Sequence, residues 1–453
     1  NPTDPSSVGS MINASGDTGG GQVDIQSTLG VNMLGLSRII ADAETGTAGQ
    51  VRIAAVGAVQ VQGDISASSK IGNGGSVGLV SSTDNMFLLG TISASGAING
   101  GSVSMFATNG GLGIDGFVSA NGGAGNGGQV AGVAETVILT ENSEVSADGG
   151  AGAGGLVGFR GTNALAAYGL LTAHGNTAGG SIFTTTDGTF DVRGLLVDAG
   201  ADAGTAGTWL LSAPSLSVVN GAAIGGIGAP VLGTAVQDAE INYAFETGTS
   251  VVLESQSDVD FNGAQLLSTS ASPLSFTVNA EGWITGLGFS ITTQGGALDM
   301  AFNANASGGN GAIRFADATL SSSGGNISMY GDSDPVVGTA SSYGTGIALA
   351  DTTITTDGGD VLIRGSSNGA RAGFDDAGVV LDATDIDAGS GAIDIYGLGA
   401  GDTSGVIALN SQIVAGSVGI DGTAEDGGDG VNLYYVDIDA GLGDVIIDGQ
   451  SLD

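Results

Sequence analysis

The stretch Val118–Ala147 reads VSANGGAGNGGQVAGVAETVILTENSEVSA and contains one short pattern twice. An apolar residue, a variable residue and an alanine form Val118-Ser119-Ala120 and, 27 residues later, Val145-Ser146-Ala147. The pattern recurs about every 26 residues through the first half of the chain, with its alanines at Ala14, Ala43, Ala67, Ala94, Ala120, Ala147, Ala173 and Ala199. A fixed period of this length is typical of a solenoid, in which each coil buries its apolar face against its neighbours.

A second pattern repeats with the same period. It consists of a glycine, one residue, and then valine or a substitute, at Val23, Val51, Val77, Val103, Val130, Val157, Ile182 and Trp209. In the second half, an apolar residue, about two small and mostly polar residues and a glycine recur every 25 to 34 residues, at Ile291, Leu320, Ile354, Ile386, Ile413 and Ile438. Short alternating runs such as Val361–Arg364 predict strands, and the Gly, Asn and Asp clusters between them predict turns.

These patterns predict an all-β fold, a parallel β-helix of about 17 coils. A β-sandwich is the alternative, but a sandwich requires no fixed 26-residue period. We expect a glycine-rich β-helix segment over 1–212, a junction with irregular loops over 213–262, and a second β-helix segment over 263–453 that becomes acidic toward its end. A short helix is expected within the junction, at 236–248, after Asp238 as a helix N-cap.

The charge of the chain excludes several classes of partner. There are 46 acidic and 8 basic residues, a net charge of −38, and no cysteine. Nucleic acids and anionic membrane surfaces are bound through Lys and Arg, so we expect neither as a partner. Thiol catalysis, zinc–thiolate sites and disulfides all require cysteine. No apolar run is long enough for a membrane-spanning helix, so direct membrane insertion is not expected.

Three groups of residues resemble catalytic or metal sites but have a simpler explanation. His174 occupies a turn position that holds Ser15, Ser68, Ser95, Asn121, Asp148 and Gly200 in other copies, so we interpret it as a turn residue. The pair Asp375–Asp376 with nearby Arg371 could serve glycan cleavage, but no second carboxylate pair accompanies it. The acidic run Thr423–Gly430 could bind calcium, yet it lacks the spacing of known calcium loops. We therefore predict no catalytic residue, no metal and no cofactor.

One candidate ligand site comes from aligning coils of the second half. If Ile327, Val361 and Ile393 point inward, the residues three positions later point outward. These residues are Tyr330, Arg364 and Tyr396, here called the Tyr–Arg–Tyr column. Sugars pack on aromatic faces and bond to guanidinium groups, so the column is a candidate glycan-binding strip. The alternative is a ladder that only stabilises the coils through cation–π contact.

Two stretches near the junction carry a family resemblance. GTWLLSAPSLSV at 207–218 resembles a marker of large filamentous-haemagglutinin-like exoproteins of bacterial two-partner secretion, where it closes a glycine-rich block. AEINYAFETGTSVVLES at 239–255 is similar to the short helix and strand that follow in that family, and Thr353–Val361 is similar to its coils. The resemblance implies a right-handed β-helix, export through a dedicated outer-membrane transporter, and adhesion.

The resulting expectation is a secreted, non-enzymatic bacterial adhesin of the cell surface or biofilm matrix. It would mediate cell–cell or cell–matrix attachment by binding exopolysaccharide, which the resemblance implies. The net charge favours a neutral polysaccharide, because it would repel an anionic one at low salt. A glycan-cleaving β-helix enzyme and a purely structural spacer stalk are the alternatives. Open sheet edges near Ser10 and Ile447 also predict that the chain is part of a longer rod.

Overall fold

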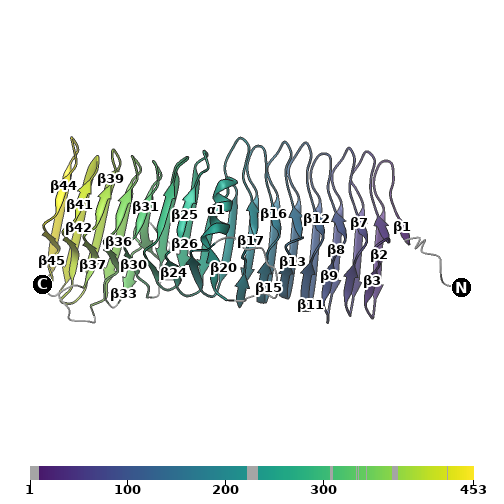
Figure 1. Cartoon of the computed structure of the whole chain (residues 1–453), viewed down its shortest axis with the longest axis horizontal. Helices are drawn as coiled ribbons and strands as arrows, with labels where there is room; N and C mark the ends of the chain where they lie inside the picture. The colour runs from purple at the N-terminus through teal and green to yellow at the C-terminus, as the bar shows by residue number, and fades with distance from the viewer. Residues whose placement is uncertain are drawn as a thin grey trace. The chain divides into compact units, whose positions relative to one another are not determined.

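The computed structural model describes residues 10–221, 233–306, 310–332, 334, 336–342, 344–369, 376–425 and 427–452. In this part of the chain it contains 45 β-strands and one α-helix (Figure 1). The strands form a parallel β-solenoid of about 15 turns, with coils of about 27 residues. The predicted all-β parallel β-helix with one short helix is therefore confirmed, although it has fewer coils than the 17 expected.

The chain divides into two compact units, each built from more than one stretch of the sequence. The first unit contains 1–213, 223–234 and 247–250, and the second contains 214–222, 235–246 and 251–453. The interval 213–262, predicted to be a junction, therefore contributes residues to both units.

The first unit has a narrow sheet and a broad sheet (Figure 1). The narrow sheet contains, in order, β1 (Met11–Asn13), β4 (Arg38–Ile40), β7 (Asp64–Ser66), β10 (Thr91–Ser93), β12 (Phe117–Ser119), β14 (Glu144–Ser146), β16 (Leu170–Thr172) and β19 (Leu196–Asp198). The broad sheet contains β2 (Gln22–Ser27), β5 (Gln50–Ala55), β8 (Ser76–Ser81), β11 (Ser102–Ile114), β13 (Gln129–Leu139), β15 (Leu156–Ala167), β17 (Ser181–Thr186) and β20 (Thr208–Ala213). The broad sheet then turns a corner. The part of this sheet beyond the corner contains β3 (Val31–Met33), β6 (Val59–Val61), β9 (Met86–Leu88), the ends of β11, β13 and β15, and β18 (Thr189–Asp191).

Both repeated patterns of the first half lie in register between successive coils. In the narrow sheet, Ile92 is aligned with Val118, and Val118 with Val145. In the broad sheet, Val103 pairs with Val130, and the same column ends at Trp209. All of these side chains are at most 1% exposed. The period of the sequence is thus the length of one coil, because each coil hydrogen-bonds to the equivalent residues of the next.

The second unit has three parallel sheets (Figure 1). One contains β25 (Gln265–Ser268), β28 (Ser290–Thr293), β31 (Thr319–Ser321), β35 (Thr353–Thr355), β38 (Asp385–Asp387), β41 (Gln412–Val414) and β44 (Asp437–Asp439). Another contains β22 (Ala235–Gln237), β21 (Leu216–Val219), β24 (Val259–Asn262), β27 (Ile284–Leu287), β30 (Ile313–Ala316), β34 (Ile347–Ala350), β37 (Ala377–Asp382), β40 (Ser404–Leu409) and β43 (Val431–Tyr434). The third contains β23 (Ser250–Ser255), β26 (Leu274–Ala280), β29 (Leu298–Ala304), β32 (Ile327–Gly331), β33 (Ala340–Ser342), β36 (Val361–Ser367), β39 (Ala392–Gly399), β42 (Ser417–Glu425) and β45 (Val445–Leu452).

Stacked phenylalanines fill the first part of the core of the second unit, from Phe245 to Phe315. Phe245, on the helix, contacts Phe276 at 5.9 Å between ring centroids. Further contacts at 5.0 to 6.5 Å continue through Phe261, Phe302, Phe289 and Phe315. Successive coils therefore add rings to one continuous apolar column, which is the usual way that a solenoid builds its core.

One corner of each coil in the second unit requires a left-handed backbone. Equivalent corner residues have φ between 46° and 63°, namely Gly263, Gly288, Asp317, Asp351, Ala383, Asn410 and Tyr435. Glycine, Asn and Asp accept this conformation most readily. The two aspartates of this set, Asp317 and Asp351, are therefore explained by the geometry of the corner.

The helix α1 (Asp238–Glu246) lies where the sequence predicted it. The backbone N–H of Gln237 donates to the Glu240 carboxylate at 3.1 Å, an arrangement that closes a helix N-terminus. The Asp238 carboxylate, only 4% exposed, instead accepts the backbone N–H groups of Gly221 at 3.1 Å and Gln265 at 2.9 Å. Asp238 was predicted as an N-cap, but it mainly fastens the helix to neighbouring chain segments.

Candidate functional site

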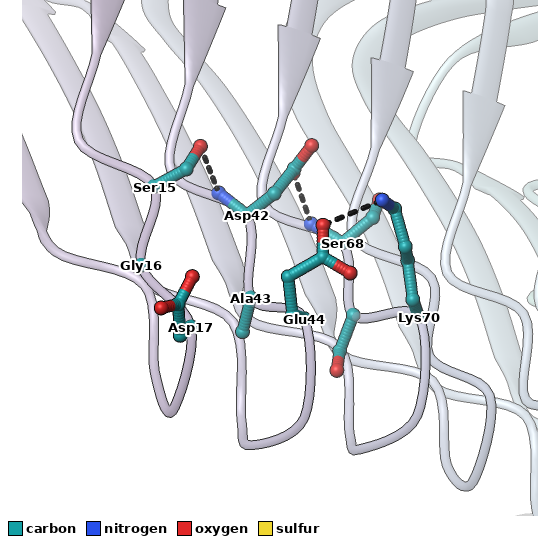
Figure 2. Close-up of a pocket in the computed structure, with 9 residues that line it drawn as sticks. Ser15, Gly16, Asp17, Asp42, Ala43, Glu44, Ser68 and Lys70 are labelled. Atoms are coloured by element: carbon teal, nitrogen blue, oxygen red, sulfur yellow. Dashed lines mark hydrogen bonds and ion pairs between the residues drawn. The ribbon is translucent and has the colours of Figure 1, made fainter.

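A row of polar side chains follows one turn of the first unit from coil to coil. The backbone N–H of Asp42 donates to Ser15 Oγ at 3.2 Å, and the backbone N–H of Ser68 donates to Asp42 Oδ1 at 2.8 Å (Figure 2). The same kind of bond recurs in later coils. The backbone N–H of Asn121 donates to Ser95 Oγ at 3.1 Å, and the backbone N–H of Asp148 donates to Asn121 Oδ1 at 2.7 Å. Each side chain therefore satisfies a backbone donor of the next coil, which is a structural role.

The depression in Figure 2 lies beside the start of this polar row and has a volume of about 320 Å³. Its most prominent charged pair is Lys70 with Glu44, joined at 2.6 Å between Nζ and Oε1. The hydrogen bond and charge of Glu44 raise the pKa of Lys70 above its ordinary value. Because the polar groups here are largely bonded to one another, the depression offers few free groups for chemistry.

The structure places His174 in the same polar row. Its backbone N–H donates to Asp148 Oδ1 at 2.8 Å, as the row requires. Its ring lies between two carboxylates, with Nδ1 3.0 Å from Asp198 Oδ1 and Nε2 3.2 Å from Asp202 Oδ1. Carboxylates only accept hydrogen bonds, so both contacts are made together by the protonated ring. This arrangement is a clamp between coils, and neither ring nitrogen contacts a nucleophile.

The clamp predicts a pH dependence of stability. Partial burial lowers the pKa of His174, but the hydrogen bonds and charges of Asp198 and Asp202 outweigh burial and raise that pKa above its ordinary value. The stabilisation is therefore complete below the unfolded-state pKa, about 6.5, and is lost as the pH rises through the higher folded-state pKa.

We expect His174→Ala to lower the free energy of unfolding by less than about 1 kcal/mol, because the ion pairs are partly exposed. Denaturant unfolding of both proteins from about pH 5 to about pH 8 measures the difference. The difference should shrink as the pH rises. A difference that is constant over this range would contradict the clamp.

The structure brings two members of the Tyr–Arg–Tyr column into contact. Ile327, Val361 and Ile393, predicted to point inward, are aligned with one another and are at most 1% exposed. Arg364 is aligned with Tyr396, and the guanidinium carbon lies 4.1 Å from the centroid of the Tyr396 ring.

Tyr330 lies at the same level of the neighbouring coil. The aligned residues of β32 and β36 end at Met329 and Ile363, one position before Tyr330 and Arg364. Tyr330 is half-buried, and this burial, with the charge of Asp334, raises the pKa of its hydroxyl. Tyr396 is the most exposed member of the column, at 39%.

Arg364 and one other arginine differ from the remaining basic residues. Among the described Lys and Arg residues, five form ion pairs, namely Arg38, Arg52, Lys70, Arg160 and Arg193. The other two, Arg314 and Arg364, have no carboxylate within ion-pair distance in the part of the chain that the structure describes. Both guanidinium groups instead lie over aromatic rings, Arg314 over Trp283 at 4.6 Å. Among the described residues, each of these two guanidinium groups is thus held by a ring and not by an ion pair.

The sequence did not point to the pair of Trp283 and Arg314. They flank the aligned residues Ile284 and Ile313, Trp283 one position before and Arg314 one position after. Such a diagonal contact between coils is visible in the sequence only if the register is already known.

The remaining candidates give no site in the described residues. Arg371 and Asp375 lie outside them, and Asp376, partly buried, directly precedes β37. In the acidic run Thr423–Gly430, Asp426 is also outside them. No group of three or more His, Asp or Glu residues in the described part could hold a metal ion. Nor does that part contain a helix long and apolar enough to cross a membrane.

Comparison with known proteins adds no family to this description. No protein-family model, no curated protein and no solved structure matches the chain. The fold therefore defines the class of the protein, a parallel β-solenoid.

Proposed function

We propose that the chain is part of a secreted, non-enzymatic bacterial adhesin that binds neutral exopolysaccharide. The observation that carries the proposal is the Arg364 guanidinium, which lies over the exposed Tyr396 ring and has no ion pair among the described residues. The Tyr–Arg–Tyr column is the proposed binding strip.

The chemistry of the column suits a sugar. A pyranose presents a face of C–H groups to an aromatic ring and hydroxyl groups at its edge, which guanidinium N–H groups can bind. The Arg364 Nε is buried and has no hydrogen-bond partner in the described structure, so the ring rather than a hydrogen bond fixes that end of the group. The outer N–H groups are the ones that would reach a ligand.

Weak contacts of this kind are useful when they are repeated. A polysaccharide offers many identical units, and several weak sites on one chain raise the overall avidity without a deep pocket. The charge of −38 disfavours an anionic polymer, which supports a neutral one.

The cellular setting of the proposal comes from the resemblance to filamentous-haemagglutinin-like exoproteins. Within that family, the chain most resembles the biofilm-matrix adhesin of pseudomonads, which binds exopolysaccharide and holds cells together. We accordingly propose export through an outer-membrane transporter and a location at the cell surface or in the biofilm matrix, with cell–cell or cell–matrix attachment as the role.

Co-sedimentation with a neutral bacterial exopolysaccharide tests the proposal. We expect the chain to be retained without releasing oligosaccharide, and Arg364→Ala combined with Tyr396→Ser to weaken retention about tenfold. Tyr434→Ser is the matched control, because Tyr434 is an exposed tyrosine of the same unit outside the column. Retention that is equal in all three proteins would reject the column, and release of sugar would indicate an enzyme. A chain that is not retained at all would be a spacer.

A further inference from the structure

A recess opens at one corner of the first unit, where the two parts of its broad sheet meet. Its volume is about 550 Å³, which lies within the range of small-molecule sites. We call it the corner recess and define it by six of its lining residues, which come from three successive coils: Asp84, Phe87, Asn109, Gly113, Glu135 and Ile138.

The recess exists because one coil turns this corner with fewer residues than its neighbour. Four residues separate Ala107 from Leu112 in β11, whereas two separate their aligned partners Ala134 and Val137 in β13. The register shifts at this corner, and the longer corner stands out beside the shorter one. Irregularities of this kind are frequent next to functional sites, since they interrupt an otherwise uniform surface.

The floor of the corner recess is apolar. Phe87, Gly113 and Ile138 are aligned across β9, β11 and β13. A methyl group on Gly113 would lie 3.0 Å from Phe87 Cδ1, so the ring packs against bare backbone and no side chain at that position covers it. Phe87 remains 45% exposed, so its ring is open to a ligand. Phe106 and Phe117 of the same unit are exposed to a similar degree, but neither lines the recess.

The rim of the corner recess is polar and carries no cation. Asp84, Asn109 and Glu135 are exposed around the floor. The corner itself is held in place, because the Gly111 N–H donates to Asn85 Oδ1 at 2.7 Å and the Asn109 side-chain N–H donates to Ser82 O at 2.9 Å. Lys, Arg and His are absent from the lining residues, all of which belong to the described part of the chain.

We propose that the corner recess binds sugar residues of a neutral polysaccharide. An exposed ring beside carboxylate and amide groups matches a ligand with an apolar face and several hydroxyl donors. A nucleic acid or another polyanion would face two carboxylates without a cation. An extended peptide would find no free strand edge here, because β11 is paired on both sides, with β9 and with β13. This second site does not depend on the Tyr–Arg–Tyr column.

The test uses the whole chain with both column tyrosines replaced, Tyr330→Ser and Tyr396→Ser, so that binding reports on the recess alone. The probes are short neutral oligosaccharides of glucose, mannose or galactose. Binding of each probe is measured by saturation-transfer NMR. We expect at least one probe to bind at millimolar concentration and Phe87→Ser to weaken that binding at least about tenfold, the cost of losing a buried ring contact. If Phe87→Ser proves unstable, Glu135→Arg is the second variant. Its larger side chain would fill the rim and should weaken oligosaccharide binding by a similar factor.

The matched control is Phe106→Ser. Phe106 is 42% exposed on the same strand β11 but does not line the recess, so its loss should leave binding unchanged. Absence of binding by all three probes, or equal weakening by Phe106→Ser, would overturn the proposal. The column is tested separately by exopolysaccharide retention in a Phe87→Ser background, which removes the recess. Unchanged retention there on adding Arg364→Ala and Tyr396→Ser would reject the column and leave the recess standing, so the two proposals fail separately.

Discussion

Replacing Gly128 with alanine should destabilise the first unit by about 3 kcal/mol, the upper range for forcing an extra methyl group into a packed region. The new methyl group would lie 2.0 Å from the carbonyl oxygen of Gly101 and 2.8 Å from that of Ala120. Both atoms are backbone, and Gly101 belongs to the preceding coil, so the clash cannot be relieved by rotating a side chain. Its neighbour Gly127 is equally close to Ala147 of the next coil, at 1.9 Å.

Chemical denaturation followed by circular dichroism measures this effect, with Gly158→Ala as the matched control. Gly158 lies in strand β15, and a methyl group there would meet nothing closer than 3.7 Å. We expect the control to be neutral or stabilised by up to about 1 kcal/mol, since alanine restricts the unfolded chain. An equal change in the free energy of unfolding for both substitutions would contradict the close approach of the coils at Gly128.

Arg193→Ala should also cost about 3 kcal/mol, because it leaves a buried carboxylate without its cation. The Asp191 side chain is 1% exposed, and Arg193 binds it twice, at 2.8 Å from Nε and at 2.7 Å from Nη2. The Tyr168 hydroxyl donates to the same carboxylate at 2.8 Å. Burial and this hydrogen bond raise the pKa of Tyr168, while the carboxylate raises the pKa of Arg193.

The control for this cluster is Arg160→Ala. Arg160 forms an equally short ion pair with Asp187, at 2.7 Å, but both side chains are about half exposed. Exposed pairs contribute little, so the control should lose no more than about 1 kcal/mol. The two variants are compared in the same denaturation experiment. Equal losses would show that burial of Asp191 does not determine the strength of its ion pair.

The repeat of the sequence was sufficient to predict the solenoid. Columns such as Val103 with Val130 lie in register because a hydrogen-bonded coil has a fixed length. The helix at Asp238–Glu246 was likewise visible from local spacing. The alignment of Arg364 with Tyr396 followed from the same period, since residues at equal positions of successive coils must stack.

Features that depend on the difference between neighbouring coils could not be predicted. The corner recess arises from a two-residue difference between β11 and β13, and the pair of Trp283 and Arg314 from a diagonal contact. A repeat describes what the coils share, so these departures give no periodic signal. The ligand of the Tyr–Arg–Tyr column stays a prediction until retention is measured.

The sequence by itself determined the parallel β-solenoid, its coil length and the absence of thiol chemistry, because period and composition act on every coil alike. Tertiary structure alone decided which glycines lie against the backbone of another coil and which described arginines lie over a ring and not beside a carboxylate. Gly128 belongs to the repeated pattern of glycine, one residue and valine, but the structure is needed to show that it lies against the backbone of another coil whereas Gly158 does not. Arg160 and Arg364 are likewise the same residue, and only packing leaves one beside a carboxylate and the other over a ring.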